Sequence, residues 1–355
     1  MRSKWLKAVL FFLLIGEIGF FTFEIKNYKT DLSNLSSSNL ITIKPSEKKE
    51  EEILNFDPFN LTWQEIVSKA DWSERDAHTL IVFKNKLWLI GGVGGAAPDY
   101  SQNKSDIWSS EDGKIWFLVT EKTPWGERRA HESVFFQNKI WVLGGVTSGE
   151  RYLNDVWSSE DGENWIKVID HASWTPRKGF KAVVFNDKIF VMGGVDEKGV
   201  VNDVWYSEDG KNWSLATPHA QWSPRYDLTA EVFNNKIWLS GGVVPGEMGK
   251  NDIWYSEDGI NWEKIKENMP WPGRHGHCLL SFQNYLWIMG GWSGYGKGFN
   301  DVWFSKDGTL WQKTNKDAAW SGREDLTCVV FKNRIWIAGG MKTNGQRTND
   351  VWSSL

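Results

Sequence analysis

The placement of the tryptophans constrains the fold of this chain more than any other feature. Twenty-three of the 25 tryptophans fall into four columns of a unit that recurs six times, at intervals of 48 to 53 residues. Each unit also carries a Gly-Gly pair, which begins at Gly91 in the first unit and at Gly339 in the last. A period of this length indicates a repeat architecture in which each unit is one supersecondary element. Most of the tryptophans are therefore expected in the core.

Four short strand signals make up each unit, as the second unit illustrates. Residues 133–136 and 140–143 are apolar and are joined by Gln137-Asn138-Lys139, where Asn tolerates a left-handed backbone. Residues 155–159 and 165–168 flank Asp161-Gly162. This dipeptide predicts a two-residue hairpin with positive φ at both central residues. No segment after residue 58 shows a sustained 3.6-residue apolar period, so each unit is predicted to be a four-stranded antiparallel sheet.

Six such sheets predict an all-β, six-bladed propeller over residues 58–355. The last unit stops at Leu355, after its third strand. Residues 61–67 match the fourth strand of the other units and would complete that blade. An N-terminal strand would therefore close the ring and protect its edges.

The chain resembles the kelch-repeat propellers, in particular bacterial kelch-like proteins built from N-D-V-W-S-S-x-D-G-x-x-W units. The resemblance covers roughly residues 58–355 and extends to the central domain of galactose oxidase. It implies the propeller fold but is not specific for a function. The copper site of galactose oxidase needs two histidines, two tyrosines and a cysteine, whereas this chain has only two cysteines, both expected in inner strands. We therefore expect no copper chemistry.

The N-terminal residues 1–57 do not fit the repeat. Arg2, Lys4 and Lys7 precede an apolar run over residues 8–23, which is the layout of a signal sequence. We expect residues 1–25 to be an uncleaved signal anchor, with a cleaved signal peptide as the alternative, and residues 26–57 to be a polar linker. Either form places the propeller outside the cytoplasm, held at the membrane or secreted into the periplasm or medium.

Composition narrows the classes of partner and cofactor. The net charge is −4 and there is no basic stripe, so we expect no nucleic-acid partner. The sequence holds no ligand cluster with metal spacing, no nucleophile elbow and no phosphate loop, so we expect no metal and no cofactor. Cys278 and Cys328 differ by one residue in register, which would point them to opposite faces of their sheets. We expect two buried thiols, although an exported compartment would permit a disulfide.

An arginine stands three residues after the first-column tryptophan in every unit. These arginines are Arg75, Arg128, Arg177, Arg225, Arg274 and Arg323. An element present six times favours a structural bracket, and the alternative is a positive collar at the channel mouth that would suit a carboxylate-bearing ligand. His78, His131 and His277 also share one column and are expected to be structural.

The two positions after each arginine vary from blade to blade, as a binding rim on a repeated scaffold should. The candidate rim residues are Asp76, Arg129, Lys178, Tyr226, Asp227, His275, Glu324 and Asp325. Positive charge gathers on the second and third units, and His275 is the obvious acid–base candidate. Trp292 lies outside the tryptophan columns, where it either packs in its loop or stacks on a ligand. The long loop over residues 92–106, with Tyr100, is a candidate lid.

Three functions are compatible with this pattern. The favoured one is a non-catalytic binding or scaffold module for a protein or glycan, on the face that bears the loops before strand one and between strands two and three. The alternative is a metal-free sugar epimerase or mutarotase of the sialic-acid type acting at the channel mouth, with His275 and Glu324 as the reacting pair. A structural role in an envelope complex is the third. We name no catalytic residue for the favoured function.

Overall fold

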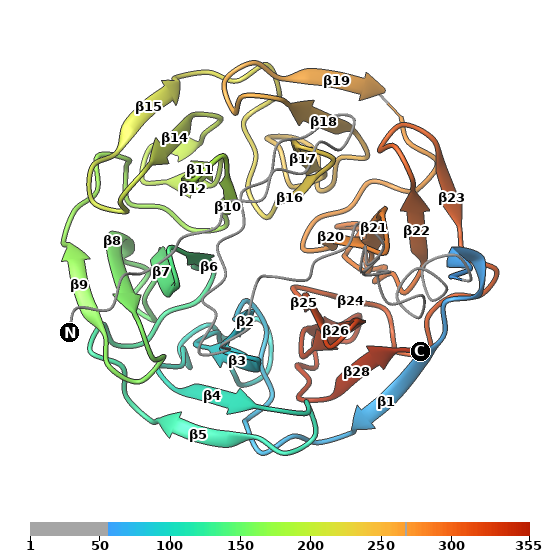
Figure 1. Ribbon diagram of the computed structural model, residues 1–355, viewed down its shortest axis with the longest axis horizontal. Coiled ribbons are helices and arrows are strands. Elements are labelled where there is room, and N and C mark those ends of the chain that lie inside the picture. Colours follow the sequence, from blue (N-terminus) through green and yellow to red (C-terminus); the bar gives the residue numbers. More distant parts are fainter. Residues whose placement is uncertain (1–55, 267) are drawn as a thin grey trace, which may run out of the picture. The chain divides into compact units, whose positions relative to one another are not determined.

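Six four-stranded antiparallel sheets stand around a central channel in the computed structural model, which describes residues 56–266 and 268–355 (Figure 1). The predicted signal segment and all of the linker before Phe56 lie outside the described residues. The blades are numbered here in chain order. Blade 1 consists of β2 (Thr79–Phe83), β3 (Lys86–Ile90), β4 (Ile107–Ser110) and β5 (Phe117–Thr120). Blade 2 consists of β6 (Glu132–Phe136), β7 (Lys139–Val146), β8 (Tyr152–Ser159) and β9 (Ile166–Ile169). Blade 3 consists of β10 (Lys181–Phe185), β11 (Lys188–Met192), β14 (Val204–Ser207) and β15 (Ser214–Thr217).

Blades 4 to 6 repeat the same order from the channel outward. Blade 4 consists of β16 (Thr229–Phe233), β17 (Lys236–Ser240), β18 (Ile253–Ser256) and β19 (Glu263–Lys266). Blade 5 consists of β20 (Cys278–Phe282), β21 (Tyr285–Met289), β22 (Val302–Ser305) and β23 (Trp311–Lys313). Blade 6 consists of β25 (Thr327–Phe331), β26 (Arg334–Ala338), β28 (Val351–Ser354) and β1 (Trp63–Val67). Two short ribbons lie in loops, β12 (Val195–Asp196) with β13 (Gly199–Val200) and β24 (Arg323–Glu324) with β27 (Met341–Lys342).

Ring closure by the N-terminal strand is confirmed. Strand β1 pairs antiparallel with β28, so that Trp63 lies opposite Ser354. Just before β1, a single 3-10 turn, η2 (Pro58–Asn60), packs against blade 5, where the Phe59 and Phe304 ring centroids are 4.9 Å apart. No helix in the described residues is long and apolar enough to cross a membrane.

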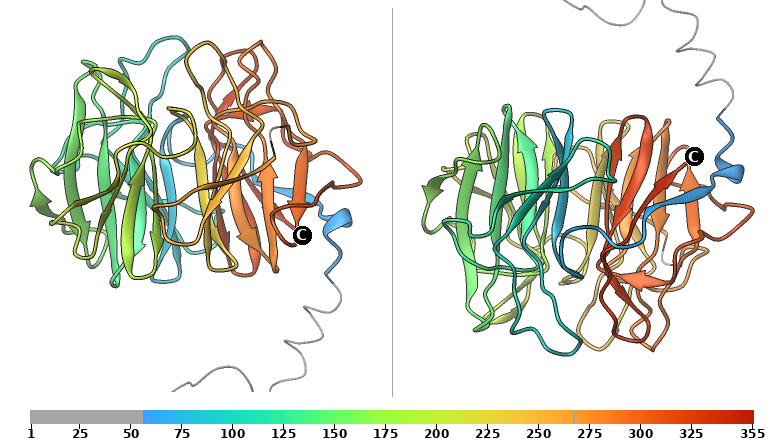
Figure 2. Two further views of the ribbon diagram at one scale, coloured as in Figure 1. Left: turned by 90° about the horizontal axis from the view of Figure 1, so that it is seen from above. Right: turned by 90° about the horizontal axis from the view of Figure 1, so that it is seen from below.

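The hydrophobic core lies between neighbouring blades and explains two of the repeated motifs. The Trp88 ring of blade 1 sits against the Asp-Gly turn of blade 2, where a Cβ at Gly162 would lie only 2.4 Å from it. Glycine at this position lets the second-column aromatic ring of a neighbouring blade pack against the turn, as Trp336, Trp88, Trp141, Phe190 and Trp238 do. In side view the strands run between the two faces of the ring (Figure 2).

The turn chemistry differs from the prediction in one respect. The two-residue turns with positive φ at both central residues join strands one and two, as at Gln137 (φ 47°) and Asn138 (φ 59°). The predicted hairpin forms, because β8 and β9 pair antiparallel, but its two-residue primed turn is wrong. Only Gly162 and not Asp161 has positive φ, and the connection from β8 to β9 spans residues 160–165. The Asp161 carboxylate instead accepts hydrogen bonds from the backbone N–H groups of Glu163 and Asn164, at 2.8 and 2.7 Å. A longer turn closed by a side chain thus replaces the primed turn.

Candidate binding site at the channel mouth

The repeated arginines are buried brackets and do not form a collar. In blade 4 the Arg225 guanidinium contacts both carboxylate oxygens of Asp252, at 2.7 and 2.8 Å, and donates to the Gly241 carbonyl at 2.8 Å. The indole N–H of Trp254 donates to the same carboxylate at 2.9 Å. All six arginines are at most 1% exposed. The collar alternative is therefore wrong, because the arginine charges are paired inside the blades and do not face the channel mouth.

The pKa of the bracket carboxylate shows which effect dominates. Burial alone would raise the pKa of Asp252, but the hydrogen bonds and the positive charge of Arg225 outweigh it and hold the pKa below its usual range. The bracket is thus a fully ionised pair at neutral pH.

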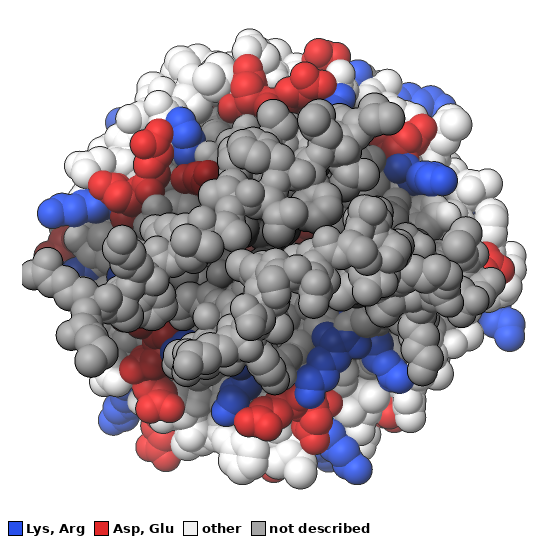
Figure 3. All heavy atoms as spheres, viewed as in Figure 1, with Lys and Arg blue, Asp and Glu red and all other residues white. Residues whose placement is uncertain are grey.

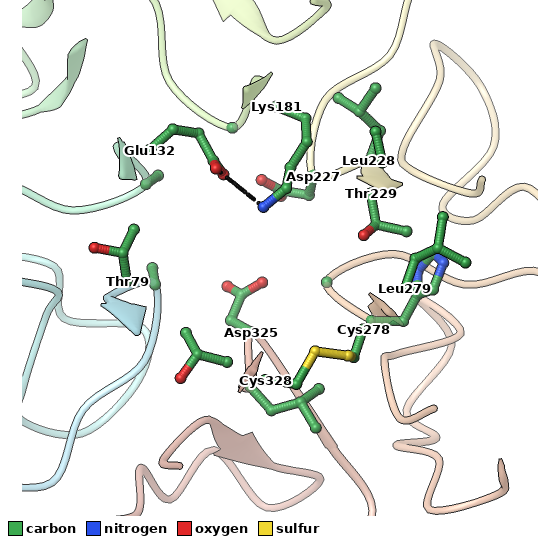
Figure 4. A pocket seen from close by; sticks show the side chains of 18 of the residues that line it. Thr79, Glu132, Lys181, Asp227, Leu228, Thr229, Cys278, Leu279, Asp325 and Cys328 are labelled. Carbon is green, nitrogen blue, oxygen red and sulfur yellow. Dashed lines mark hydrogen bonds and ion pairs between the residues drawn. A yellow bond between two sulfur atoms is a disulfide. The ribbon is translucent and has the colours of Figure 1, made fainter. Parts of the chain in front are cut away.

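The channel entrance is a ring of backbone hydrogen bonds. The residue two positions after each arginine has a left-handed backbone, with φ between 49° and 60°, and five of these residues donate their N–H to the equivalent carbonyl of the preceding blade at 2.7–3.1 Å. The ring residues are Ala77, Ala130, Gly179, Asp227, Gly276 and Asp325. Only Asp227 and Asp325 carry side chains long enough to reach into the channel, and Figure 4 shows both pointing there. The ring is thus a rigid frame that presents two carboxylates.

His275 and Glu324 come together across the seam between blades 5 and 6. His275 Nε2 lies 3.1 Å from Glu324 Oε2, and His275 Nδ1 lies 2.6 Å from the Met248 carbonyl oxygen. Because both ring nitrogens face acceptors, the doubly protonated imidazolium is favoured. Burial lowers the pKa of His275, but the bond to Glu324 and the charge of Asp227 more than compensate, so its pKa is raised.

The predicted positive cluster of blades 2 and 3 is largely compensated. Glu150, in the loop between β7 and β8, forms an ion pair with Arg129 and another with Lys178, the latter at 3.0 Å. Arg129 also donates to the Asn103 side-chain oxygen at 3.2 Å. Glu150 is not among the predicted site residues, because the sequence of its loop does not indicate where the loop folds back.

Arg347 is a second residue that sequence reasoning missed. Its Nε lies 3.0 Å from Asp76 Oδ1, and its Nη1 donates to the carbonyls of Gly94, Gly95 and Asp99 at 2.9–3.2 Å. The Tyr100 ring lies between the guanidinium groups of Arg347 and Arg129, at 5.3 and 4.7 Å from its centroid. Arg347 thus holds the loop over residues 92–106 beside the mouth. In the sequence, only the unusual length of this loop indicated a special role.

The remaining rim residues line the outer part of the mouth. Tyr226 is half-buried, and burial with the nearby Asp227 charge raises its pKa. Trp292 takes the position that valine holds in blades 1 to 4, and its backbone exchanges two hydrogen bonds with His275, at 3.1 and 3.0 Å. The Trp292 side chain is half-buried. Its backbone is thus paired with His275, and both readings of the indole, packing in its loop or stacking on a ligand, stay predictions.

The channel holds a cavity of about 210 Å³, which is lined by the ring residues and by the first strands of the blades (Figure 4). Its wall carries the ion pair Glu132–Lys181, at 3.0 Å, and the carboxyl of Glu231, whose pKa burial raises to about 8. Three histidines of one column line the same wall. Burial and the adjacent arginine charges lower the pKa of His78 to about 3, and those of His131 and His277 also lie below the usual range. These histidines are neutral at physiological pH.

The two cysteines form a disulfide, so the expectation of two free thiols is wrong. Cys278 and Cys328 join β20 to β25 across the seam between blades 5 and 6, with their Cα atoms 6.2 Å apart. Thr79 and Ser133 occupy the equivalent positions of blades 1 and 2, and their hydroxyl oxygens lie 2.7 Å apart. The offset of one residue points side chains apart within one sheet but brings them together across the seam between two blades.

Comparison with known proteins settles the family. The family description "KLHDC2/KLHL20/DRC7 Kelch-repeats domain" matches residues 77–291 of this chain. The protein belongs to the kelch-repeat family. A solved structure titled "Structure of YjhT" is similar at 18% identity with a TM-score of 0.64, covering 81% of this chain and 96% of that one. At that identity the likeness shows the fold alone, and no curated protein matches the chain significantly.

The surface that is drawn for the described residues carries charges of both signs. Figure 3 shows acidic and basic side chains near one another around the circumference of the ring. Among the described residues, no group of three or more His, Cys, Asp and Glu side chains is arranged to hold a metal ion. The mouth thus offers carboxylates, phenols and one imidazole to a ligand.

Proposed function

We propose that this kelch propeller is an exported recognition module that binds a protein or a glycan over its channel mouth. One observation carries the proposal. The arginines repeated in every blade are buried in brackets, whereas the two positions that follow them differ between blades and include Asp227 and Asp325, which line the cavity. A rigid scaffold with a variable rim is the arrangement that recognition by loops requires.

Export is supported by two separate features. Disulfides persist mainly in oxidising compartments, so the Cys278–Cys328 bridge fits a protein outside the cytoplasm. The basic residues and apolar run of the first 23 residues have the layout of a signal sequence, and an uncleaved segment would tether the propeller to the membrane. Fractionation of the native cells, with protease added outside, tests this: a propeller protected inside the cytoplasm would rule export out.

The binding proposal is tested by saturation-transfer NMR on the full chain with a panel of neutral and acidic sugars. We expect transfer to at least one sugar, lost in the double variant Tyr226→Ala/Trp292→Ala and kept in Asp187→Asn, a control on the exposed turn between β10 and β11. If no sugar shows transfer, the ligand is a protein, and cross-linking in native membranes should then capture it through the same residues. A ligand that binds both variants equally well would contradict the mouth as the site.

A second candidate is a metal-free sugar epimerase or mutarotase, which the His275–Glu324 pair favours. An imidazolium 3.1 Å from a carboxylate can donate a proton to a ring oxygen while a neighbouring carboxylate accepts one. The same NMR tubes report anomer interconversion. Turnover lost in His275→Ala and in Glu324→Ala would identify an enzyme, and unchanged anomer ratios in the wild type would exclude it for those sugars.

A further inference from the structure

Charge at the channel mouth is balanced for every acidic group except two. Asp76 pairs with Arg347, Glu324 pairs with His275, and Glu150 pairs with both Arg129 and Lys178. Deeper in the channel, Glu132 pairs with Lys181, whereas Glu231 forms no ion pair with a described residue and burial raises its pKa to about 8. The cations that approach the mouth are thus already engaged with carboxylates.

Asp227 and Asp325 are the exceptions. Among the described residues, neither carboxylate accepts a hydrogen bond or forms an ion pair, and both line the cavity and point into it (Figure 4). Each is half-buried and leans over a glycine of the preceding blade. A Cβ at Gly179 would lie 2.5 Å from Asp227 Oδ1, and one at Gly276 would lie 2.4 Å from Asp325 Oδ1. The backbone ring therefore holds in place two half-buried carboxylates that no cation of the described residues contacts directly, although His275, Lys178 and Arg129 lie close enough to Asp227 to lower its pKa.

We infer that the mouth takes an ammonium group, carried by an amine-bearing ligand, with Asp227 and Asp325 as its counter-charges. This rests on the proposed function, because it specifies which ligand the same mouth binds. Partial burial disfavours an ionised carboxylate that has no direct partner, and a bound cation would offset that cost. An anionic ligand would instead bring further negative charge to this entrance.

The cavity and its rim define the rest of the ligand. At about 210 Å³ the cavity is smaller than the ~300–1,000 Å³ pockets that enclose a whole drug-sized ligand, so it admits a head group only. Met248, Trp292 and Tyr295 provide apolar surface on blades 4 and 5, with Met248 43% and Tyr295 79% exposed. The loops of Met248 and Gly294 touch, since a Cβ at Gly294 would lie 2.0 Å from the Met248 Cβ. An ammonium head group with an apolar or ring-shaped body outside fits this shape.

Protonation supports the same conclusion. The pKa of Asp227 is raised to about 6, because burial and the charge of Glu324 outweigh the opposing charges of His275, Lys178 and Arg129. Burial and the charges of Asp227, Glu324 and Asp76 raise the pKa of Asp325 against Arg347. A bound cation would lower both pKa values. Binding should therefore release protons near neutral pH and weaken as the pH falls through about 6.

The test uses the full chain and two matched pairs of probes. Nα-acetyl-lysine amide is compared with Nα-acetyl-norleucine amide, and glucosamine with glucose, by titration calorimetry at pH 7.5. We expect the charged member of at least one pair to bind roughly tenfold or more tightly than its neutral partner, as an ion-paired hydrogen bond implies. The lysine pair represents a protein partner, and the glucosamine pair represents an amino sugar.

Variants and buffers then locate the binding. Asp227→Asn, Asp325→Asn and the double variant should each lose that preference, whereas Asp187→Asn should keep it. Asn tolerates the left-handed backbone of these positions, so the ring should persist. Titrations of the wild type in buffers of different ionisation enthalpy should show proton release, a readout that needs no variant.

The outcomes separate this inference from the proposed function. Equal binding of charged and neutral probes, or no binding of either amine, overturns the ammonium inference. If a neutral or acidic sugar binds instead and depends on Tyr226 and Trp292, the proposed function stands without it. If no ligand depends on any residue of the mouth, both fail.

Discussion

The bracket of each blade and the mouth of the channel both contain aspartates, but those of the bracket are paired with a cation, whereas two of those at the mouth pair with no described residue. Inside blade 4 a carboxylate and a guanidinium bury each other completely, and the pKa of Asp252 is held low. At the mouth, Asp227 is half-buried and forms no ion pair with a described residue, and its pKa is raised to about 6. The comparison teaches that repetition marks the residues that stabilise the fold, and departure from the repeat marks those left free for a ligand.

The largest expected effect comes from breaking a bracket. Arg225→Ala leaves Asp252 buried without its partner, and removing one member of a buried pair costs about 3–5 kcal/mol. Chemical denaturation should show this loss in the free energy of unfolding. Arg151→Ala, an exposed arginine, is the control and should change it by less than about 0.5 kcal/mol. A bracket variant as stable as this control would contradict the claim that the brackets stabilise the fold.

The second-largest effect is expected at the seam between blades 5 and 6, which the disulfide crosses. The double variant Cys278→Ser/Cys328→Ser should lose about 2–4 kcal/mol, because the bridge closes a loop with a sequence separation of 50 residues. Thr79→Val/Ser133→Ala removes the hydrogen bond in the equivalent seam and should cost about 1 kcal/mol. Equal losses in the two seams would mean that the bridge adds nothing to the constraint that the ring already imposes.

A mouth carboxylate should behave in the opposite way. The folded-state pKa of Asp227 is raised above its unfolded value of 3.8, so its contribution is present at low pH and is lost as the pH rises through about 6. Asp227→Asn should therefore stabilise the protein by about 1–2 kcal/mol at pH 7.5. The gain should shrink towards zero near pH 4. Melting curves across this range check it, and destabilisation at pH 7.5 would show that Asp227 has a structural partner.

The smallest effect on stability is expected at the turn between β8 and β9. Asp161→Ala removes the acceptor of two backbone N–H groups and should cost about 1 kcal/mol. Asp161→Asn keeps an acceptor oxygen and should cost less. If both variants unfold like the wild type, the backbone alone determines this turn.

The sequence predicted the fold well because the signals were repeated. Tryptophan columns, Gly-Gly pairs and the match of residues 61–67 to a fourth strand each report on local packing or pairing, and the structure confirms the blade count and the closing strand. The Asp-Gly turn was misread because the Asp161 side chain, and not its backbone, makes the turn. Local patterns thus give the strands but not always the chemistry of the connections.

The mouth could be predicted only in part. The position of the variable residues follows from the repeat, but their partners come from other blades. Arg347 is about 250 residues from the loop that it fastens, and Glu150 folds back onto Arg129 and Lys178 from a neighbouring loop. The disulfide was missed because the geometry across a seam is not that within a sheet. Such long-range pairings are set by ring closure and leave no local pattern.

The most direct test of the account measures stability and binding together in two variants. Arg225→Lys should lower the melting temperature yet bind the ligand normally well below that temperature, because only the bracket is changed. Asp227→Asn should raise the melting temperature at pH 7.5 and lose the ligand. That crossed result would show that architecture and recognition occupy separate residues. Loss of both properties in both variants would contradict the central claim that the repeated brackets and the variable mouth have distinct roles.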